Sequence, residues 1–441
     1  MKTSTAAKAI SLLWMGAMGG AACAFFMQAL LARKLGPANY GEFSAIYAIV
    51  LMLSPIAAFG VQGLWLMLFA EEGGAERRWL PASLKFSTLT SVLAITLIFG
   101  WAKFGYNNVT ATTILLLFVP HVVGQAAIEL VSGKLQLEER FLSLALWQTA
   151  PHLARLGTVI IAVVLGGDIG NAENVAVIYG FIGLVIVIIG ISQLSQMTSS
   201  RFKLKGHVNA KTNNCISSRL TEVVSVLAVA KQSWAFGIGA LFYFIYLQSN
   251  TVLLYYLGVS AEIVGQYNTA LTIMTAVYLF PSVVYQKFML PKIQRWTISD
   301  RARLYMAHKR GIVLMAASGV GGALCTWLVA PYMILLLFGE RYMGAVTLLN
   351  FLVFCIPIRF IATCLGAALS TRRNIRRKVF YMGCAAVANV AASFMLIPIW
   401  GAKGAIVGTA LGELVLLLLY QYSCAKYVFS KNLKSIHNYS V

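Results

Sequence analysis

The sequence predicts an all-α integral membrane protein with about twelve transmembrane helices in two pseudo-symmetric six-helix lobes. Of its 441 residues, 59% are hydrophobic and 11% are charged, whereas about a quarter of the residues of a soluble domain are charged. A helix that crosses a hydrocarbon core about 30 Å thick needs about 20 apolar residues, and runs such as 175–192 and 404–422 approach this length. Backbone polar groups in lipid must be bonded internally, so helices are the expected form.

The apolar runs alternate with short polar loops and divide the chain into twelve predicted spans. Most of the 35 Lys and Arg residues fall in alternate loops, and the positive-inside rule then places both termini in the cytoplasm. In order, the predicted spans are 9–32, 41–69, 82–102, 111–133, 143–166, 175–197, 231–256, 265–286, 311–337, 345–370, 379–397 and 404–424.

The net charge of +21 would suggest nucleic acid as a partner of a soluble protein. Because the charges mark the topology of a membrane protein instead, no nucleic-acid partner is expected. Most of the seven cysteines fall inside spans without paired metal-like spacing, and we interpret them as packing residues.

A polar segment near the middle of the chain separates six spans from six. It predicts an N-terminal lobe (1–200), a basic cytoplasmic linker (201–230) and a C-terminal lobe with a cytoplasmic tail (231–441). The halves echo one another, since 35–43 after the first span is similar to 257–267 after the seventh. Prolines recur at matching places, Pro55 with Pro281 and Pro120 with Pro357. Parallel repeats of this kind occur in alternating-access transporters with the substrate site between the lobes.

Two short segments carry a resemblance to a known family. Residues 32–43, ARKLGPANYGEF, resemble the "AR.LGP..YG.F" signature of Wzx-type polysaccharide flippases, and residues 396–405, LIPIWGAKGA, resemble their "LIP.yG..GAA" element. These flippases belong to the multidrug/oligosaccharidyl-lipid/polysaccharide (MOP) exporter superfamily. We expect the signature residues to shape turns and helix packing. They are Gly36, Pro37, Tyr40, Gly41, Pro398, Gly401 and Gly404.

The resemblance implies a fold like that of the MATE exporters and a function in translocation. The substrate it implies is an undecaprenyl-pyrophosphate-linked oligosaccharide, which is moved from the inner to the outer leaflet of a bacterial inner membrane for O-antigen or another surface polysaccharide. The implied partners are this lipid-linked glycan, membrane lipids, a polysaccharide polymerase and a chain-length regulator.

Ionisable side chains inside spans are candidates for the substrate path. Gln148, His152 and Arg155 have the spacing i, i+4, i+7, which places them on one face of the fifth span. A guanidinium stays charged and binds phosphate oxygens at two points, which suits a pyrophosphate. The alternative for Arg155 is an ion pair with another helix, for example with Glu129.

Arg359 lies in the middle of the tenth span and would add a second cation from the other lobe. Its alternatives are snorkelling to the interface or an internal pair with Glu413. His121 could be protonated or could bond a neighbouring helix. Glu129 and Glu413 are candidates for binding a coupling ion.

Asn250 shares a face with Tyr243 and Tyr246 in the seventh span, and Asn389 is central in the eleventh. Amides and tyrosines can bind sugars, and they equally form interhelical hydrogen bonds. Both readings remain open.

The sequence is less typical of three other functions. A cation-coupled drug exporter of the same superfamily should carry acids in its cavity, which the first and seventh spans lack, and peptidoglycan-precursor flippases generally have two additional spans. A membrane enzyme acting on lipid-linked sugars would need a large outside loop, and the outside loops are short. The sequence has no nucleotide-binding loop, His-Glu-x-x-His helix or paired Cys-x-x-Cys element. We therefore expect no enzyme activity and no cofactor.

Overall fold

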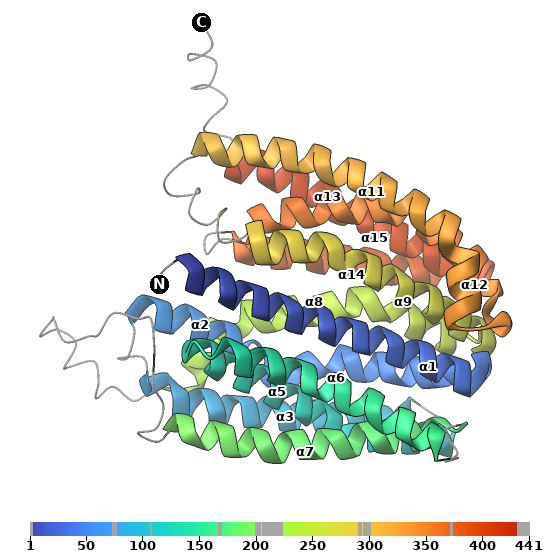
Figure 1. The fold of residues 1–441 in the computed structure, drawn as a ribbon, viewed down its shortest axis with the longest axis horizontal. Coiled ribbons are helices and arrows are strands. Elements are labelled where there is room, and N and C mark those ends of the chain that lie inside the picture. Colours follow the sequence, from blue (N-terminus) through green and yellow to red (C-terminus); the bar gives the residue numbers. More distant parts are fainter. Residues whose placement is uncertain are drawn as a thin grey trace, which may run out of the picture. The chain divides into compact units, whose positions relative to one another are not determined.

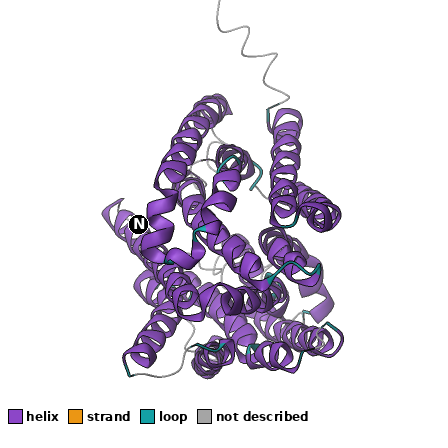
Figure 2. Ribbon diagram, turned by 90° about the vertical axis from the view of Figure 1, so that its right-hand side faces the viewer, coloured by secondary structure: helices purple, strands orange, loops and turns teal. Residues whose placement is uncertain are grey.

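A computed structural model describes residues 3–72, 77–105, 108–165, 170–198, 204, 224–289, 293, 301–370 and 374–429. The described residues form helices joined by short loops, with no strand among them (Figures 1 and 2). Eight of these helices are long and apolar enough to cross a membrane, or nine if one bent pair counts as a span. Of the predicted linker 201–230, all but 204 and 224–230 lies outside the described residues.

The helices follow the predicted spans in order. They are α1 (Thr3–Ala58), α2 (Val61–Glu72), α3 (Trp79–Phe104), α4 (Val109–Leu117), α5 (Val119–Leu137), α6 (Phe141–Val164), α7 (Ala172–Thr198), α8 (Val226–Tyr256), α9 (Ala261–Val283), η3 (Val284–Met289), α11 (Arg301–Leu337), η4 (Glu340–Tyr342), α12 (Gly344–Leu352), α13 (Cys355–Ala368), α14 (Ile375–Trp400), α15 (Ala402–Ser423) and η5 (Cys424–Val428). Each predicted span coincides with a helix or with a pair of helices separated by a break, so the prediction of about twelve is confirmed.

Two spans share α1, because Gly36 turns the chain within this long helix. Its φ of 72° and ψ of 168° lie outside the helical region, at a positive φ that glycine adopts without a steric penalty. The fifth and eighth predicted spans, α6 and α9, are helices that are not among those counted above as long and apolar enough to cross a membrane. Both contain polar side chains, including the stripe that ends at Arg155 on α6.

The spans that contain paired prolines are interrupted. Phe59 and Gly60, both at positive φ, separate α1 from α2 just after Pro55, and Pro120 lies in the first turn of α5. Helices α12 and α13 meet at a bend of 44° shortly before Pro357. Proline lacks the backbone N–H and clashes with the preceding turn, which explains a break just before Pro120 or Pro357. The break after Pro55 coincides instead with the positive φ of Phe59 and Gly60.

The chain divides into two compact units. Unit 1 comprises 1–27 and 45–244, and unit 2 comprises 28–44 and 245–441. This division differs from the predicted lobes in two ways: residues 231–244 of α8 pack with unit 1, and the segment 28–44 packs with unit 2.

In unit 1, small residues let neighbouring helices approach closely. Helix α5 packs chiefly on α7, where a Cβ at Gly124 or at Gly183 would press on the backbone of the other helix. The start of α1 packs on α6, where Gly16 lies against Ala145 and the Thr149 hydroxyl donates to the Gly16 carbonyl at 2.9 Å. Such small residues at contacts are typical of helix packing in membranes.

In unit 2, the first signature segment packs against α9 at backbone distance. A Cβ built at Gly41 would overlap the carbonyl of Ala261, and one built at Gly265 would overlap the carbonyl of Pro37. The buried Tyr40 hydroxyl donates to Gln28 at 3.0 Å and accepts from the Asn268 amide at 3.0 Å. The segment is therefore held by both close packing and hydrogen bonds.

The second signature segment forms the turn between α14 and α15. Gly401 has a φ of 56°, and its backbone N–H donates to the Ile397 carbonyl at 2.7 Å. A Cβ at Gly404 would overlap the Leu396 carbonyl. Pro398 lies inside the last turn of α14, just before this tight connection.

Candidate functional site

The most unusual group of unit 1 is Arg155, a buried cation on α6 that is 3% exposed. Its Nη2 lies 3.1 Å from His121 Nδ1 on α5, and its guanidinium lies over the Tyr179 ring of α7 at 4.9 Å. Its Nε is buried, and no described residue offers it a hydrogen-bond partner. Within the described part of the chain, Arg155 forms no ion pair with an acid. Unit 1 therefore holds a positive charge whose contacts among the described residues are with an imidazole and an aromatic ring.

The contact with Arg155 determines the protonation state that His121 must have. Arginine can only donate hydrogen bonds, so Nδ1 of His121 must accept and the imidazole must be neutral. The ring is 0% exposed and lies against Tyr47, Phe118 and Tyr179, with centroid distances of 5.8, 6.0 and 5.4 Å. A proton on Nδ1 would place two cations in contact, so the observed geometry belongs to neutral His121.

Of the three residues predicted to share a face of α6, the structure places His152 near Arg155 but directs Gln148 to another partner. His152 lies one turn from Arg155, near enough for their charges to interact, and is half-buried. Gln148 donates instead to the Ser132 hydroxyl on α5 at 3.4 Å. Glu129 is half-buried on α5 and makes no ion pair with Arg155, whose hydrogen bond goes to His121. Its proposed role in binding a coupling ion stays a prediction.

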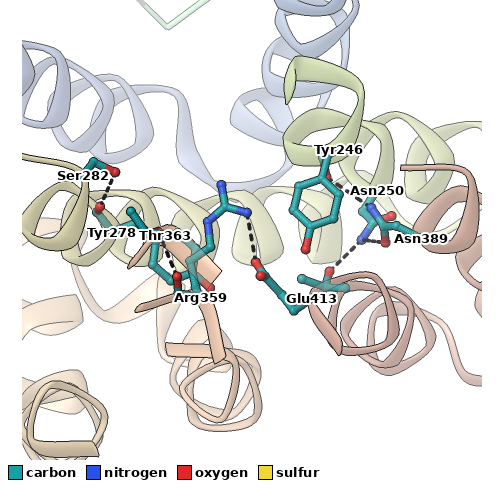
Figure 3. Close-up of polar contacts among 9 residues, drawn as sticks. Tyr246, Asn250, Tyr278, Ser282, Arg359, Thr363, Asn389 and Glu413 are labelled. Atoms are coloured by element: carbon teal, nitrogen blue, oxygen red, sulfur yellow. Dashed lines mark hydrogen bonds and ion pairs between the residues drawn. The ribbon is translucent and has the colours of Figure 1, made fainter. Parts of the chain in front are cut away.

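In unit 2 the predicted cation is paired with an acid. Arg359 Nη1 on α13 lies 3.4 Å from Glu413 Oε1 on α15, and the two side chains are 12% and 1% exposed (Figure 3). The guanidinium also lies 5.4 Å from the Tyr246 ring of α8 and 5.5 Å from the Tyr278 ring of α9. Of the alternatives for Arg359, the structure shows the pair with Glu413.

Asn250 and Asn389 form the centre of a second polar cluster in unit 2. The Asn250 amide nitrogen lies 3.2 Å from Asn389 Oδ1, 2.7 Å from the Thr409 hydroxyl and 3.0 Å from the Ala405 carbonyl (Figure 3). The Asn389 amide donates to the Tyr246 carbonyl at 3.1 Å. Both asparagines are buried, at 2% and 0% exposed. The structure therefore shows interhelical hydrogen bonds between α8, α14 and α15, while Tyr243 is exposed.

We expect Asn389→Ala to destabilise the protein by about 1–3 kcal/mol, because it leaves buried partners unsatisfied. The unfolding midpoint of the purified protein in detergent measures this. Asn350→Ala on α12 is the matched control, since the Asn350 side-chain oxygen has no hydrogen-bond partner in the described part of the chain. Equal loss of stability in both variants would contradict a structural role for the asparagine cluster.

Sequence reasoning missed several residues of both clusters. Tyr47 and Tyr179 line the Arg155 site, and Tyr278, Tyr267 and Thr409 complete the sites of unit 2. Aromatic residues are frequent in these spans, so no single tyrosine stands out. One argument could have indicated them: a buried cation requires neighbours with a π face or a lone pair, and tyrosine and threonine side chains provide these.

The comparisons with known proteins agree with the fold. Residues 6–295 match a family model described as "Polysaccharide biosynthesis protein". No curated protein sequence matches the chain.

The chain is similar to several solved structures of transporters. The lipid II flippase MurJ in an inward closed conformation matches with a TM-score of 0.70 at 13% identity, over 94% of this chain and 87% of that chain. An inward-facing MATE multidrug transporter of the MOP superfamily matches with a TM-score of 0.66 at 12% identity, over 98% of this chain and 100% of that chain. The eukaryotic MATE transporter AtDTX14 matches with a TM-score of 0.57 at 12% identity, over 96% of each chain.

These likenesses show a fold shared with the MOP superfamily, and the family model covers more than half of the chain. The chain is a multi-pass membrane protein and belongs to the polysaccharide biosynthesis protein family.

Proposed function

We propose that this protein is a flippase for lipid-linked oligosaccharides. It moves undecaprenyl-pyrophosphate-linked repeat units from the cytoplasmic to the periplasmic leaflet of a bacterial inner membrane by alternating access, for O-antigen or another surface polysaccharide. Membership of a polysaccharide biosynthesis family and a fold shared with the lipid II flippase support the movement of a lipid-linked sugar.

The observation that carries the proposal is that no acid among the described residues pairs with the buried Arg155. A buried cation without a carboxylate partner is unfavourable in a low-dielectric interior, and an anionic ligand would offset it. A diphosphate offers several acceptor oxygens to one guanidinium at short range. Arg155, with His121 and His152 beside it, is therefore the group that we assign to the pyrophosphate.

A drug exporter that captures cations is less well supported by these residues. Glu413 is paired with Arg359, so its charge is offset within unit 2, and Arg155 would repel a cationic ligand. For the proposed flippase, we place both termini in the cytoplasm and expect a polysaccharide polymerase and a chain-length regulator to act on its product.

The test is the sidedness of a labelled undecaprenyl-pyrophosphate oligosaccharide in proteoliposomes. We expect protein-dependent exposure of the sugar to an enzyme or lectin on the opposite side, and no such exposure in liposomes without protein. The same lipid with a monophosphate should move more slowly, because it offers fewer phosphate oxygens. If no glycan moves, even with imposed ion gradients, while a cationic dye does, the flippase assignment is wrong and the drug exporter is favoured.

A further inference from the structure

We propose that Glu413 is a built-in competitor for the anion site of Arg359. A diphosphate head group displaces the Glu413 carboxylate from Arg359, and the released carboxylate takes up one proton. This inference rests on the proposed function. It adds a second diphosphate-binding group, Arg359 of unit 2, to the Arg155 site assigned above, and it links substrate binding to proton binding in unit 2.

The contact between Arg359 and Glu413 is weaker than a guanidinium and a carboxylate can make. It consists of one nitrogen and one oxygen at 3.4 Å, whereas charge-assisted N–H···O bonds are about 2.7–2.9 Å long and often paired. A phosphate oxygen that approaches the same guanidinium can therefore replace this contact with a shorter one. The ring faces of Tyr246 and Tyr278 hold the guanidinium in place during the exchange.

The two partners differ in burial. Arg359 keeps 12% of its side chain exposed, while Glu413 keeps 1%. Arg359 is thus the more accessible of the two partners. Glu413 Oε2 is buried and accepts no hydrogen bond within 3.5 Å from the described residues, although the Tyr246 hydroxyl faces the same carboxylate (Figure 3). An acid this buried that loses its cation becomes neutral by binding a proton rather than staying charged.

The other titratable groups around the pair cannot supply this proton-binding role. Those that face it are Tyr246 from α8, Tyr278 from α9, Cys355 from α13, Lys378 from α14 and Tyr420 from α15. Tyrosine and cysteine are ordinarily neutral near pH 7. Lys378 is a second cation, and its Nζ donates to the Ser370 hydroxyl at 2.8 Å. Glu413 is therefore the acid of this group of described residues, and its neutralisation leaves the site with positive charge for an anion.

The exchange balances in atoms and charge. One Arg359 N–H···O bond to Glu413 breaks, and one to a phosphate oxygen forms. A proton from water binds the carboxylate and gives a carboxylic acid, which can donate to a neighbouring oxygen. No covalent bond of the substrate changes and nothing is oxidised or reduced.

Isothermal titration calorimetry in two buffers of different protonation enthalpy counts the protons taken up per anion bound. The probe is a short-chain polyprenyl diphosphate added to the purified full-length protein in detergent near pH 7. We expect the wild type to take up about one proton more per bound diphosphate than Glu413→Gln does. We also expect Glu413→Gln to bind the diphosphate at least about fivefold more tightly, since coupling between two ligands is typically 5- to 150-fold.

Glu340→Gln is the matched control, because Glu340 is an exposed acid of the same unit. It should behave as the wild type. Equal proton uptake by wild type and Glu413→Gln, with binding intact, would overturn this inference and leave the proposed function standing. A wild type that binds no diphosphate at all would overturn both.

If Glu413→Gln does not fold, infrared difference spectra of the wild type give the same answer. A band of a newly protonated buried carboxyl on diphosphate binding is expected, and it should shift in Glu413→Asp. Its absence on binding would contradict the inference.

Discussion

Replacing Arg155 by alanine is expected to lower the rate of flipping by about 10- to 100-fold, the equivalent of about 1.5–3 kcal/mol for hydrogen bonds to a charged group. The substitution removes the buried cation of unit 1 that no acid of the described residues offsets. Arg155→Lys keeps the charge but not the planar two-point geometry, so it should recover part of the rate. The proteoliposome sidedness assay measures all three proteins.

Arg140→Ala provides the matched control for this experiment. Arg140 belongs to the same unit, but it is exposed and lies 3.6 Å from Glu138, so its loss should change the rate little. Folding must be verified by unfolding midpoints, since His121 also loses its partner. Wild-type flipping by folded Arg155→Ala would remove this residue from the substrate path while leaving the family assignment intact.

Overpacking a buried site usually costs about 1–3 kcal/mol of stability. We expect Gly41→Ala to destabilise the protein by more than this. The new methyl group would overlap the carbonyl of Ala261, and backbone cannot rotate away as a flexible side chain does. Gly265→Ala should be comparably severe, because its methyl group meets the Pro37 carbonyl. The yield of folded protein and the unfolding midpoint in detergent report the effect.

Gly321→Ala separates this packing effect from a general cost of changing glycine. Gly321 lies on α11, and no atom lies within 4 Å of a Cβ built there. Alanine at this exposed helical position should be neutral or stabilising, since glycine is the poorer helix former by about 1 kcal/mol. If Gly41→Ala is as mild as Gly321→Ala, the close approach of the first signature segment to α9 is not needed for folding.

The sequence was sufficient to predict the helices because their signal is local. A run of about twenty apolar residues is long enough to span a bilayer as a helix, and the charges of the loops orient the spans. The breaks were harder to place. The prolines were interpreted only as marks of the repeat, and no break was predicted at them. Whether the chain continues as one helix or two depends on contacts such as those of Gly60 with Phe236 and Gly237.

The candidate site was predictable in its residues but not in their partners. Arg359 with Glu413 was one of the alternatives, because two opposite charges at similar depth attract strongly in lipid. Arg155 with Glu129 followed the same logic and is not what the structure shows, since Arg155 instead bonds His121. Which helix faces which depends on small residues at contacts, such as Gly183 beside His121, and one sequence does not reveal those pairings.

The membership of 28–44 in unit 2 has a consequence for dividing the protein. The sequence suggests dividing the chain within 201–230. The C-terminal fragment would then lack the segment 28–44, which packs against Gly265 and hydrogen-bonds Asn268. It would also begin with residues 231–244, which pack in unit 1. Neither fragment would contain all the residues of its compact unit. We therefore expect that neither fragment folds alone, and that both must be co-expressed for these segments to reach the residues against which they pack.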